Sequence, residues 1–375
     1  MINVQKIDVK NKKQVNQFVM FPFSLYKDCP QWVPPFIGDI KLMLNPDKHP
    51  FYEHSTADFY LATRGEEIVG RIAVMENTSF NKYHNAHKGQ FYLFDCIDDI
   101  EVAKALFAEA DAWCKARGLD ELVGPKGLSA FDGYGIQVTG FEHSQMMTMM
   151  NYNYPYYPKL MEEMGFEKEV DFVSCYLDMQ KFKMPEKIDA VATRVVERGK
   201  LQVKQFSSKK ELREWADRIG QAYNQTFVNN WEYFPLTERE IKFVLDNILF
   251  VAVPKLIKII TYEENVVGFL FGFPDISDAL KRNKGRITPW GIIDLLSSLK
   301  KARFISLNGV GVLSQFHGRG ANALLYSEMQ HTICDSGFTE AELTQVAESA
   351  VQMRKDLITI GGKEYKNHRV YKRKL

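Results

Sequence analysis

The chain has 375 residues, enough for two domains that each have a core of their own. Apolar residues make up 45% and charged residues 25%, as in an ordinary globular protein, and the net charge of +1 gives no electrostatic reason to expect nucleic acid as a partner. No apolar run approaches the roughly 18 residues of a membrane span, and the alternating start MINVQKIDVK does not resemble a signal peptide.

The cysteines are five in number and show no CxxC spacing. An odd, scattered set indicates reduced thiols, with neither a disulfide framework nor a metal site. We therefore expect a cytoplasmic protein without a bound metal.

The first elements of the chain recur in its second half. Residues 2–7 alternate apolar and polar side chains as a half-buried strand does, and a helical pattern follows over 12–26. The alternation returns at 201–206 and the helical pattern at 209–223. The sequence therefore predicts one fold written twice.

The later elements also match between the halves, once an insertion over 275–301 is allowed for in the second half. Each half continues with a strand hairpin, a strand and helix, and a closing strand. In the first half these are 59–64 with 68–74, 91–95 with 102–116, and 171–179; in the second they are 258–262 with 266–273, 303–310 with 321–336, and 365–372.

A short helix is expected over 188–198, because Val191, Val195 and Val196 would share one face of it and Gly199 suits its C-terminal cap. This helix would link the two copies. We therefore predict a first domain over 1–180, a linker helix over 181–199 and a second domain over 200–375.

A glycine loop in the second half has the features of an anion site. An apolar strand over 304–312 leads to Gly318 and Gly320, and apolar residues then recur at helical spacing from Ala321. Such a junction directs free backbone N–H groups and the positive end of a helix dipole at one point, which suits a phosphate. The loop lacks the Gly-Lys-Ser/Thr of a P-loop and the three glycines of the dinucleotide fingerprint.

The segment Gln315-Phe316-His317-Gly318-Arg319-Gly320 resembles the Q/R-x-x-G-x-G/A motif of the GNAT superfamily of N-acyltransferases, and the order of predicted elements is also that of the family. The resemblance implies an α/β protein of two tandem GNAT-like domains, each a mixed, mostly antiparallel sheet flanked by helices. It implies further that the second domain binds acetyl-CoA or a longer acyl-CoA as co-substrate. The residues it assigns to this ligand are Val310, Val312, Gln315, Phe316, His317, Gly318, Arg319, Gly320 and Ala321.

The corresponding segment of the first half, 95–101, has no glycine and carries four carboxylates. Asp98, Asp99 and Glu101 suit the cap of a helix, but they would repel a pyrophosphate. We expect the first half to be a degenerate copy that helps to wall the acceptor site.

Transfer to an amine requires a base, because an ammonium group has no lone pair and its pKa is near 10. The strand before the loop offers no carboxylate, so the candidates are Glu348, Asp275 and Glu232, which lie near the cleft that the resemblance implies. The family often protonates the departing thiolate with a tyrosine, but Leu357 stands at that position here.

Two further segments bear on the acceptor, which we expect to be a small-molecule or lipid-like amine. The aromatic loop over 151–158 is either a substrate wall or a packed seam. A helix over 289–299 with basic flanks suits a long acyl chain or peripheral contact with a membrane, or else it caps the sheet.

The predicted function is acyl-CoA-dependent transfer of an acetyl or acyl group to an amine. Tandem bacterial proteins of this kind include ones linked to N-acylation of sphingoid bases, so a long-chain N-acyltransferase is one alternative. A non-catalytic acyl-CoA-binding or scaffold protein is the other, because the tyrosine and the strand carboxylate are missing.

Overall fold

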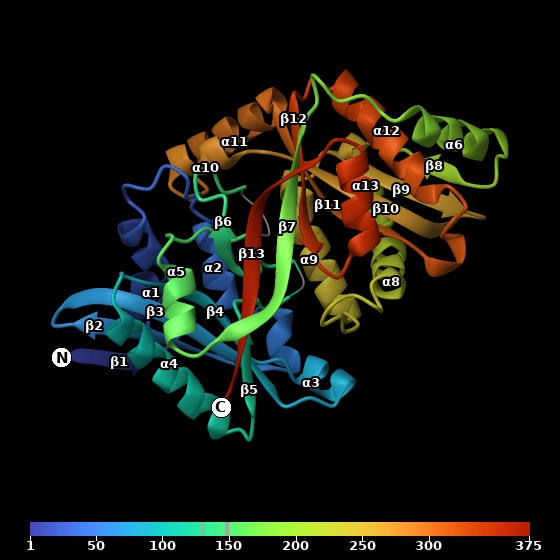
Figure 1. Ribbon diagram of the computed structural model, residues 1–375. Coiled ribbons are helices and arrows are strands. Elements are labelled where there is room, and N and C mark those ends of the chain that lie inside the picture. The colour runs from blue at the N-terminus through green and yellow to red at the C-terminus, as the bar shows by residue number, and fades with distance from the viewer. Residues whose placement is uncertain (130, 147–149) are drawn as a thin grey trace. The chain divides into compact units, whose positions relative to one another are not determined.

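The computed structural model describes residues 1–129, 131–146 and 150–375 (Figure 1). The described chain divides into two compact units. Unit 1 consists of Met1–Val173, Ser277–Leu296 and Tyr365–Leu375, and unit 2 consists of Ser174–Ile276 and Ser297–Glu364. Both units combine a mixed sheet with helices on its faces, so the expected α/β class is confirmed.

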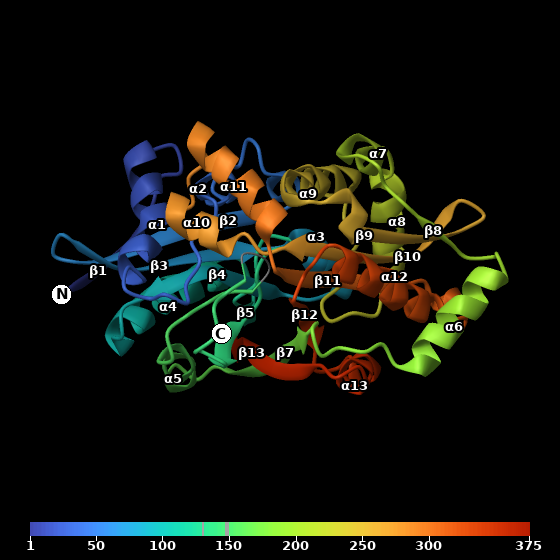
Figure 2. The same ribbon diagram turned by 90° about the horizontal axis from the view of Figure 1, so that it is seen from above.

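The sheet of unit 1 has the strand order β1-β2-β3-β4-β5-β13, and β6 also pairs with β13. Among the described residues, the register is parallel for β4 with β5 and antiparallel for β1 with β2, β2 with β3, β3 with β4, β5 with β13 and β6 with β13. Helices α1 and α2 lie on one face and α4 on the other (Figure 2). The strands are β1 (Ile2–Lys6), β2 (Thr56–Arg64), β3 (Glu67–Glu76), β4 (Lys88–Cys96), β5 (Glu121–Gly124), β6 (Ile136–Thr139) and β13 (Lys363–Lys374); the helices are α1 (Lys12–Leu25), α2 (Ile37–Met43), η1 (Pro50–Glu53), α3 (Thr78–His84), α4 (Ile100–Lys115), α5 (Tyr157–Glu163) and α10 (Ser277–Asn283).

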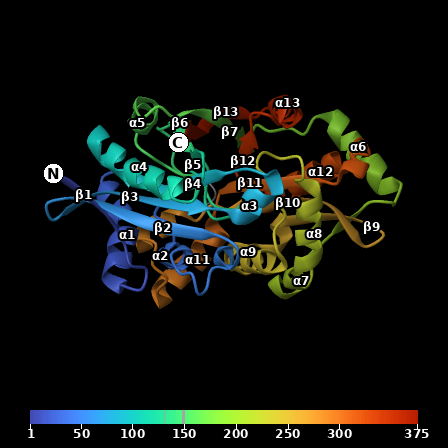
Figure 3. The same cartoon turned by 90° about the horizontal axis from the view of Figure 1, so that it is seen from below.

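The sheet of unit 2 has the strand order β12-β11-β10-β9-β8, with β11 and β12 parallel. Helices α7, α8 and α9 lie on one face of it and α12 on the other (Figure 3). The strands are β8 (Gln202–Lys204), β9 (Ile257–Tyr262), β10 (Asn265–Pro274), β11 (Phe304–Val312) and β12 (Glu340–Ala347); the helices are α6 (Glu186–Glu197), α7 (Lys209–Glu214), α8 (Ala216–Thr226), α9 (Glu238–Val251), η2 (Pro254–Leu256), η3 (Ser314–Phe316), α12 (Ala321–Asp335) and α13 (Val351–Thr359). Strand β7 (Glu167–Asp178), helix α11 (Pro289–Lys301) and the first two residues of β13 cross the division, so these three elements contribute residues to both units.

Helix α4 illustrates how the sequence pattern forms the core of unit 1. Its residues Val102, Leu106 and Ala110 recur every four positions, so they lie on one face, and all three are fully buried. The side chain of Asp99 caps the helix by accepting a hydrogen bond of 2.9 Å from the backbone N–H of Glu101. The capping role expected for Asp99 is therefore confirmed.

In each unit, one central strand leaves its parallel neighbour and then bulges. The β3–β4 register shifts around Leu93, which has a positive φ of 47°, and the β10–β11 register shifts around Gly309, whose φ is 67°. In the described chain, the registered pairing of β4 with β5 covers 88–90, and that of β11 with β12 covers 304–307. Beyond these residues the two parallel strands of each unit separate.

Most predicted elements are present, with one difference of detail: the helical pattern over 209–223 is broken at Trp215 into α7 and α8. The predicted linker helix is α6, and Gly199 just beyond it has the expected left-handed φ of 64°.

The compact units also cross the domain boundaries expected at 180 and 200. Residues 365–375 group with unit 1 because β13 pairs through its backbone with β5 and β6. The helical insertion Ser277–Leu296 groups with unit 1 as well, whereas Ser174 and the residues after it group with unit 2.

Candidate functional site

The glycine loop of unit 2 connects β11 to α12, and the buried side chain of Phe316 anchors it to the core. The Phe316 side chain is buried, and its ring lies 5.4 Å from the ring of Tyr262. The Nε2 of His317 donates a hydrogen bond of 2.8 Å to the carbonyl oxygen of Val312. The imidazole therefore closes the loop onto the end of its strand.

Both loop glycines adopt the left-handed conformation, with φ of 71° at Gly318 and 87° at Gly320. A Cβ at Gly320 would lie 2.6 Å from Val195 and 2.9 Å from Val191 of α6, so the linker helix packs directly against this residue. A Cβ at Gly318 would meet nothing within 4 Å. The approach to Gly318 is open, as a ligand that contacts the backbone requires.

The first turn of α12 presents backbone donors beside this opening. The intrahelical ladder begins with the bond from the N–H of Leu324 to the carbonyl oxygen of Gly320, at 3.0 Å, so the N–H groups of Ala321, Asn322 and Ala323 precede it. Arg319 is exposed, and its guanidinium lies 5.3 Å from the centre of the Phe316 ring. An exposed loop, the N-terminus of a helix and an exposed cation therefore follow one another within a few residues, an arrangement that suits the phosphates of CoA.

The other residues assigned to the ligand fall into two groups. Val312 and Ala321 are buried and support the two ends of the loop, while Val310 is half-buried just after the bulge of β11. Gln315 is exposed and, with Phe316, lines a groove of about 750 Å³ whose other walls come from α8 and the β9–β10 turn. The assignment of these nine residues to CoA stays a prediction.

The three candidate bases lie in three different segments of unit 2, all half-buried. Asp275 follows β10, and its backbone N–H bonds the carbonyl oxygen of Phe304 at 2.9 Å. Glu348 lies in the turn between β12 and α13, and Glu232 lies in the turn before α9 with a positive φ of 49°. None is confirmed as the base.

The structure adds a carboxylate that the sequence analysis missed. Glu342 of β12 is fully buried, and its Oε1 accepts a hydrogen bond of 3.0 Å from the Oγ of Ser306 on β11. The two residues are directly paired in the parallel register, one position before the strands separate. Strand β11, which precedes the loop, has no carboxylate of its own, but the carboxylate of Glu342 on the neighbouring strand β12 contacts it. No local sequence signal reveals that these two strands are neighbours.

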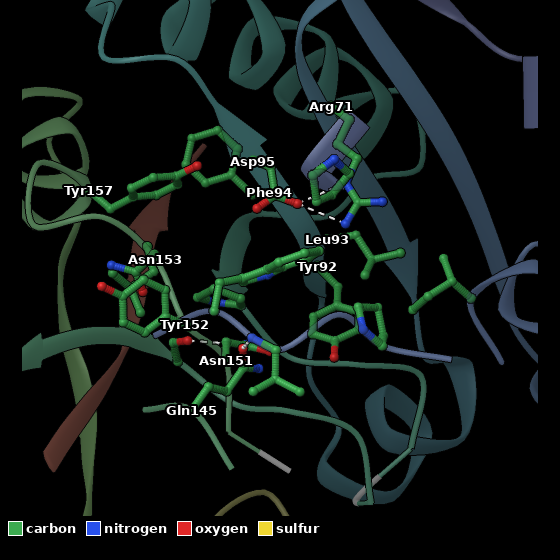
Figure 4. A pocket seen from close by; sticks show the side chains of 18 residues that line it. Arg71, Tyr92, Leu93, Phe94, Asp95, Gln145, Asn151, Tyr152, Asn153 and Tyr157 are labelled. Atoms are coloured by element: carbon green, nitrogen blue, oxygen red, sulfur yellow. Dashed lines mark hydrogen bonds and ion pairs between the residues drawn. The ribbon is translucent and has the colours of Figure 1, made fainter. Parts of the chain in front are cut away.

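Unit 1 contains a cavity of about 120 Å³ with a mixed polar and apolar lining, at the corresponding separation of β4 from β5 (Figure 4). Arg71 and Asp95 form a buried ion pair on its wall, with two N–O distances of 2.8 Å. The hydroxyl of Tyr26 donates to Asp95 at 3.1 Å, and Arg71 also donates to the carbonyl oxygen of Phe18 at 2.9 Å. Tyr152 and Tyr157, from the aromatic loop expected over 151–158, line the same cavity.

The helix that follows β4 has no comparable anion site. Asp99 occupies the N-cap of α4 and pairs with Arg64, whose hydrogen bond holds the pKa of this carboxyl below its usual value. A phosphate at the start of α4 would be repelled by the Asp99 carboxylate, whereas the corresponding position of unit 2 offers backbone N–H groups. The degenerate-copy interpretation of the first half stays a prediction.

Within the described residues, no group of three or more His, Cys, Asp and Glu side chains is arranged to hold a metal ion. All five cysteines are free thiols. Among the helices of the described chain, none combines the length and apolar character that crossing a membrane requires.

Comparison with solved structures identifies the fold. The chain aligns over its whole length with 98% of a tandem GNAT protein from the clavulanic acid biosynthesis pathway, at a TM-score of 0.59 and 10% identity. It also covers 95% of a GCN5-related N-acetyltransferase from Sphaerobacter thermophilus, at a TM-score of 0.51 and 12% identity. The chain has the tandem GNAT fold, and the expected fold resemblance is confirmed.

Two relatives are similar in sequence to nearly the whole chain. Protein YghO of Escherichia coli (strain K12) is 26% identical over 371 residues, which are 97% of this chain and 94% of that protein. The bacterial ceramide synthase of Caulobacter vibrioides (strain NA1000 / CB15N) is 27% identical over 379 residues, which are 98% of this chain and 97% of that protein. No family model matches the chain.

Proposed function

We propose that the chain is an acyltransferase that takes an acyl group from acyl-CoA, bound through its pyrophosphate at residues 315–321, and transfers it to an amine. The observation that carries the proposal is the open approach to Gly318, in a loop that leads from β11, the strand that separates from β12, to the N-terminus of α12. The fold of the solved GNAT structures and the full-length relatedness to a ceramide synthase support the same class of reaction.

The acceptor is proposed to be a long-chain, lipid-like amine. The support is the likeness to the bacterial ceramide synthase over 98% of this chain. The proposed donor is accordingly a long-chain acyl-CoA, and acetyl-CoA is the alternative.

In the proposed reaction the amine nitrogen forms a bond to the thioester carbonyl carbon, and the carbon–sulfur bond breaks. The chain must take one proton from the amine, and Glu342 is a candidate base because Ser306 fixes its carboxylate at the point where β11 and β12 part. The thiolate is a tolerable leaving group, since a thiol has a pKa near 8.5. Protonation by water then replaces the tyrosine that the family often uses.

The first test is thermal stabilisation by free CoA, acetyl-CoA and palmitoyl-CoA. A ligand that binds only the folded state at a hundredfold excess over its Kd stabilises by about 2.7 kcal/mol. Arg319→Ala should weaken the stabilisation. Arg213→Ala, which removes an exposed arginine paired with Asp246 on the helices of the same unit, is the control and should not. No stabilisation by any thioester would contradict the proposal.

The second test is turnover, measured as release of free CoA thiol from palmitoyl-CoA in the presence of a sphingoid base. A non-catalytic acyl-CoA-binding protein would be stabilised by the thioester and release no thiol with any amine. Asp99→Ala is expected to leave CoA affinity unchanged, although the loss of an N-cap costs about 1 kcal/mol of stability. A clear loss of affinity would show instead that the first half binds CoA.

A further inference from the structure

Helix α11 carries a continuous apolar surface that the fold leaves uncovered. Trp290 is 81% exposed, Ile293 58% and Leu296 53%. With the exposed residues Ile287 and Ile292 they make up what we term the α11 face. At 100° per residue, Trp290, Ile292, Ile293 and Leu296 cover an arc of about 160°, while the buried residues Gly291 and Leu295 lie on the opposite side.

This exposure is built into the fold, because hydrogen bonds join α10 and the turn before α11 to other segments of unit 1. The carbonyl oxygen of Gly285 accepts a hydrogen bond of 2.9 Å from the N–H of Ile37, and Lys281 Nζ donates to the carbonyl oxygen of Pro30 at 2.6 Å. Gly285 has a φ of 65°, and a Cβ there would lie 2.1 Å from the carbonyl oxygen of Pro35.

The start of α11 is fixed to α10 by a second set of polar contacts. Arg282 contacts both carboxylate oxygens of Asp294, at 3.1 and 2.7 Å, and Asn283 donates to the same carboxylate at 2.8 Å. These contacts hold the helix with its apolar face outward.

The surroundings of the α11 face are strongly basic, although the whole chain has a net charge of only +1. Residues 281–301 contain one acidic side chain, Asp294, and six basic ones, which are Lys281, Arg282, Lys284, Arg286, Lys300 and Lys301. Lys284 and Arg286 are exposed before the helix begins, and Lys300 and Lys301 are exposed in its last turn. Cations therefore flank the apolar face at both ends.

We propose that the α11 face docks on an anionic lipid bilayer. The helix would lie in the plane of the interface, with Trp290, Ile293 and Leu296 among the acyl chains and the flanking cations against the lipid phosphates. An apolar arc with a tryptophan and cations at both ends matches an anionic bilayer in both chemistry and charge. The proposal does not depend on the enzymatic function, since it rests on this helix alone.

The test is co-sedimentation with vesicles of phosphatidylglycerol and phosphatidylcholine, compared with vesicles of phosphatidylcholine alone. Wild-type protein should bind the anionic vesicles, lose binding at high salt, and show a blue shift in tryptophan fluorescence that Trp290→Phe removes. Absence of binding to anionic vesicles, or equal binding to both kinds, would overturn the proposal.

Two pairs of variants separate the helix from the rest of the surface. Trp290→Ser with Ile293→Ser should reduce binding at least tenfold, whereas Phe250→Ser with Val351→Ser, which change exposed apolar residues elsewhere, should not. Lys284→Glu with Arg286→Glu should likewise reduce binding at least tenfold, whereas Lys210→Glu with Lys242→Glu, exposed on α7 and α9, should leave it unchanged. All of these side chains are exposed, so thermal midpoints should stay within a few degrees of the wild-type value.

A second copy of the chain is the competing occupant. Wild-type protein that dimerises through the α11 face, becomes monomeric in the Trp290→Ser, Ile293→Ser variant and fails to bind anionic vesicles would overturn the proposal. Equal loss of vesicle binding in the control variants would do the same, because binding would then not be specific to this helix.

Discussion

The Oγ of Ser306 on β11 donates a hydrogen bond of 3.0 Å to Oε1 of Glu342 on β12. The two residues form the second-to-last registered pair of these parallel strands. A fully buried carboxylate requires such a partner, because its desolvation is otherwise unopposed. The contact thus fixes one carboxylate next to the separation of β11 from β12, and β11 is the strand that leads to the glycine loop.

If Glu342 is the base, Glu342→Gln should reduce kcat by 10² to 10⁴ while Kd for acyl-CoA stays unchanged, because the amide keeps the shape but cannot take a proton. Glu340→Gln is the matched control, since Glu340 lies two residues earlier on β12 and accepts a hydrogen bond from Tyr176 at 2.8 Å. Full activity of Glu342→Gln would exclude Glu342 as the general base and leave Glu348, Asp275 and Glu232 as the candidates.

The two loop glycines should respond differently to alanine. Both substitutions place a side chain at positive φ, which costs on the order of 1–3 kcal/mol. Gly320→Ala must also displace Val195 and Val191, whereas Gly318→Ala meets open space, so Gly320→Ala should lower the thermal midpoint further. Differential scanning calorimetry of the two variants checks this, and an equal or larger effect at Gly318 would contradict the packing of α6 on the loop.

The two partners of the buried pair in unit 1, Arg71 and Asp95, should contribute to stability in a non-additive way. Asp95→Asn or Arg71→Met alone leaves a buried charge uncompensated, which costs about 3–5 kcal/mol. The double variant should be less destabilised than the sum of the singles. Urea denaturation of all three gives the coupling energy, and simple additivity would mean that the pair does not interact in solution.

His368 should make stability depend on pH. Burial lowers the pKa of this imidazole to about 3, its Nε2 donates to the carbonyl oxygen of Asn151 at 2.8 Å, and its Nδ1 is buried without a partner among the described residues. The folded protein holds a neutral ring while the unfolded chain binds a proton below about pH 6.5. Stability is therefore present above pH 6.5 and falls as the pH drops toward 3.

The expected loss at pH 5 is about 2 kcal/mol, from 1.36 kcal/mol per pH unit. His368→Gln should flatten the pH dependence of the thermal midpoint between pH 6.5 and 4. An unchanged slope in this variant would mean that other groups cause the acid lability.

The sequence alone predicts the glycine loop and the repeated elements because these signals are local. Gly318 and Gly320 stand where the backbone must be left-handed, and the alternation of each strand marks which residues face the core. The break of the 209–223 helix at Trp215 was missed because the apolar periodicity runs across it.

The sequence does not predict which strands pair with each other. The contact between Ser306 and Glu342 depends on a parallel register between strands that are separated by a helix. In the same way, the alternation of β13 predicts a strand but not that it pairs with β5, far away in the first half of the chain.

The place of β13 has a consequence for biosynthesis. Residues 365–375 complete the sheet of unit 1, yet the ribosome makes them after all of unit 2. The N-terminal unit therefore cannot finish folding as it emerges, and its β5 edge stays open to other strands until translation has passed residue 365. A nascent chain halted at residue 360 should accordingly be cut readily by protease in unit 1 and become resistant once β13 has been released.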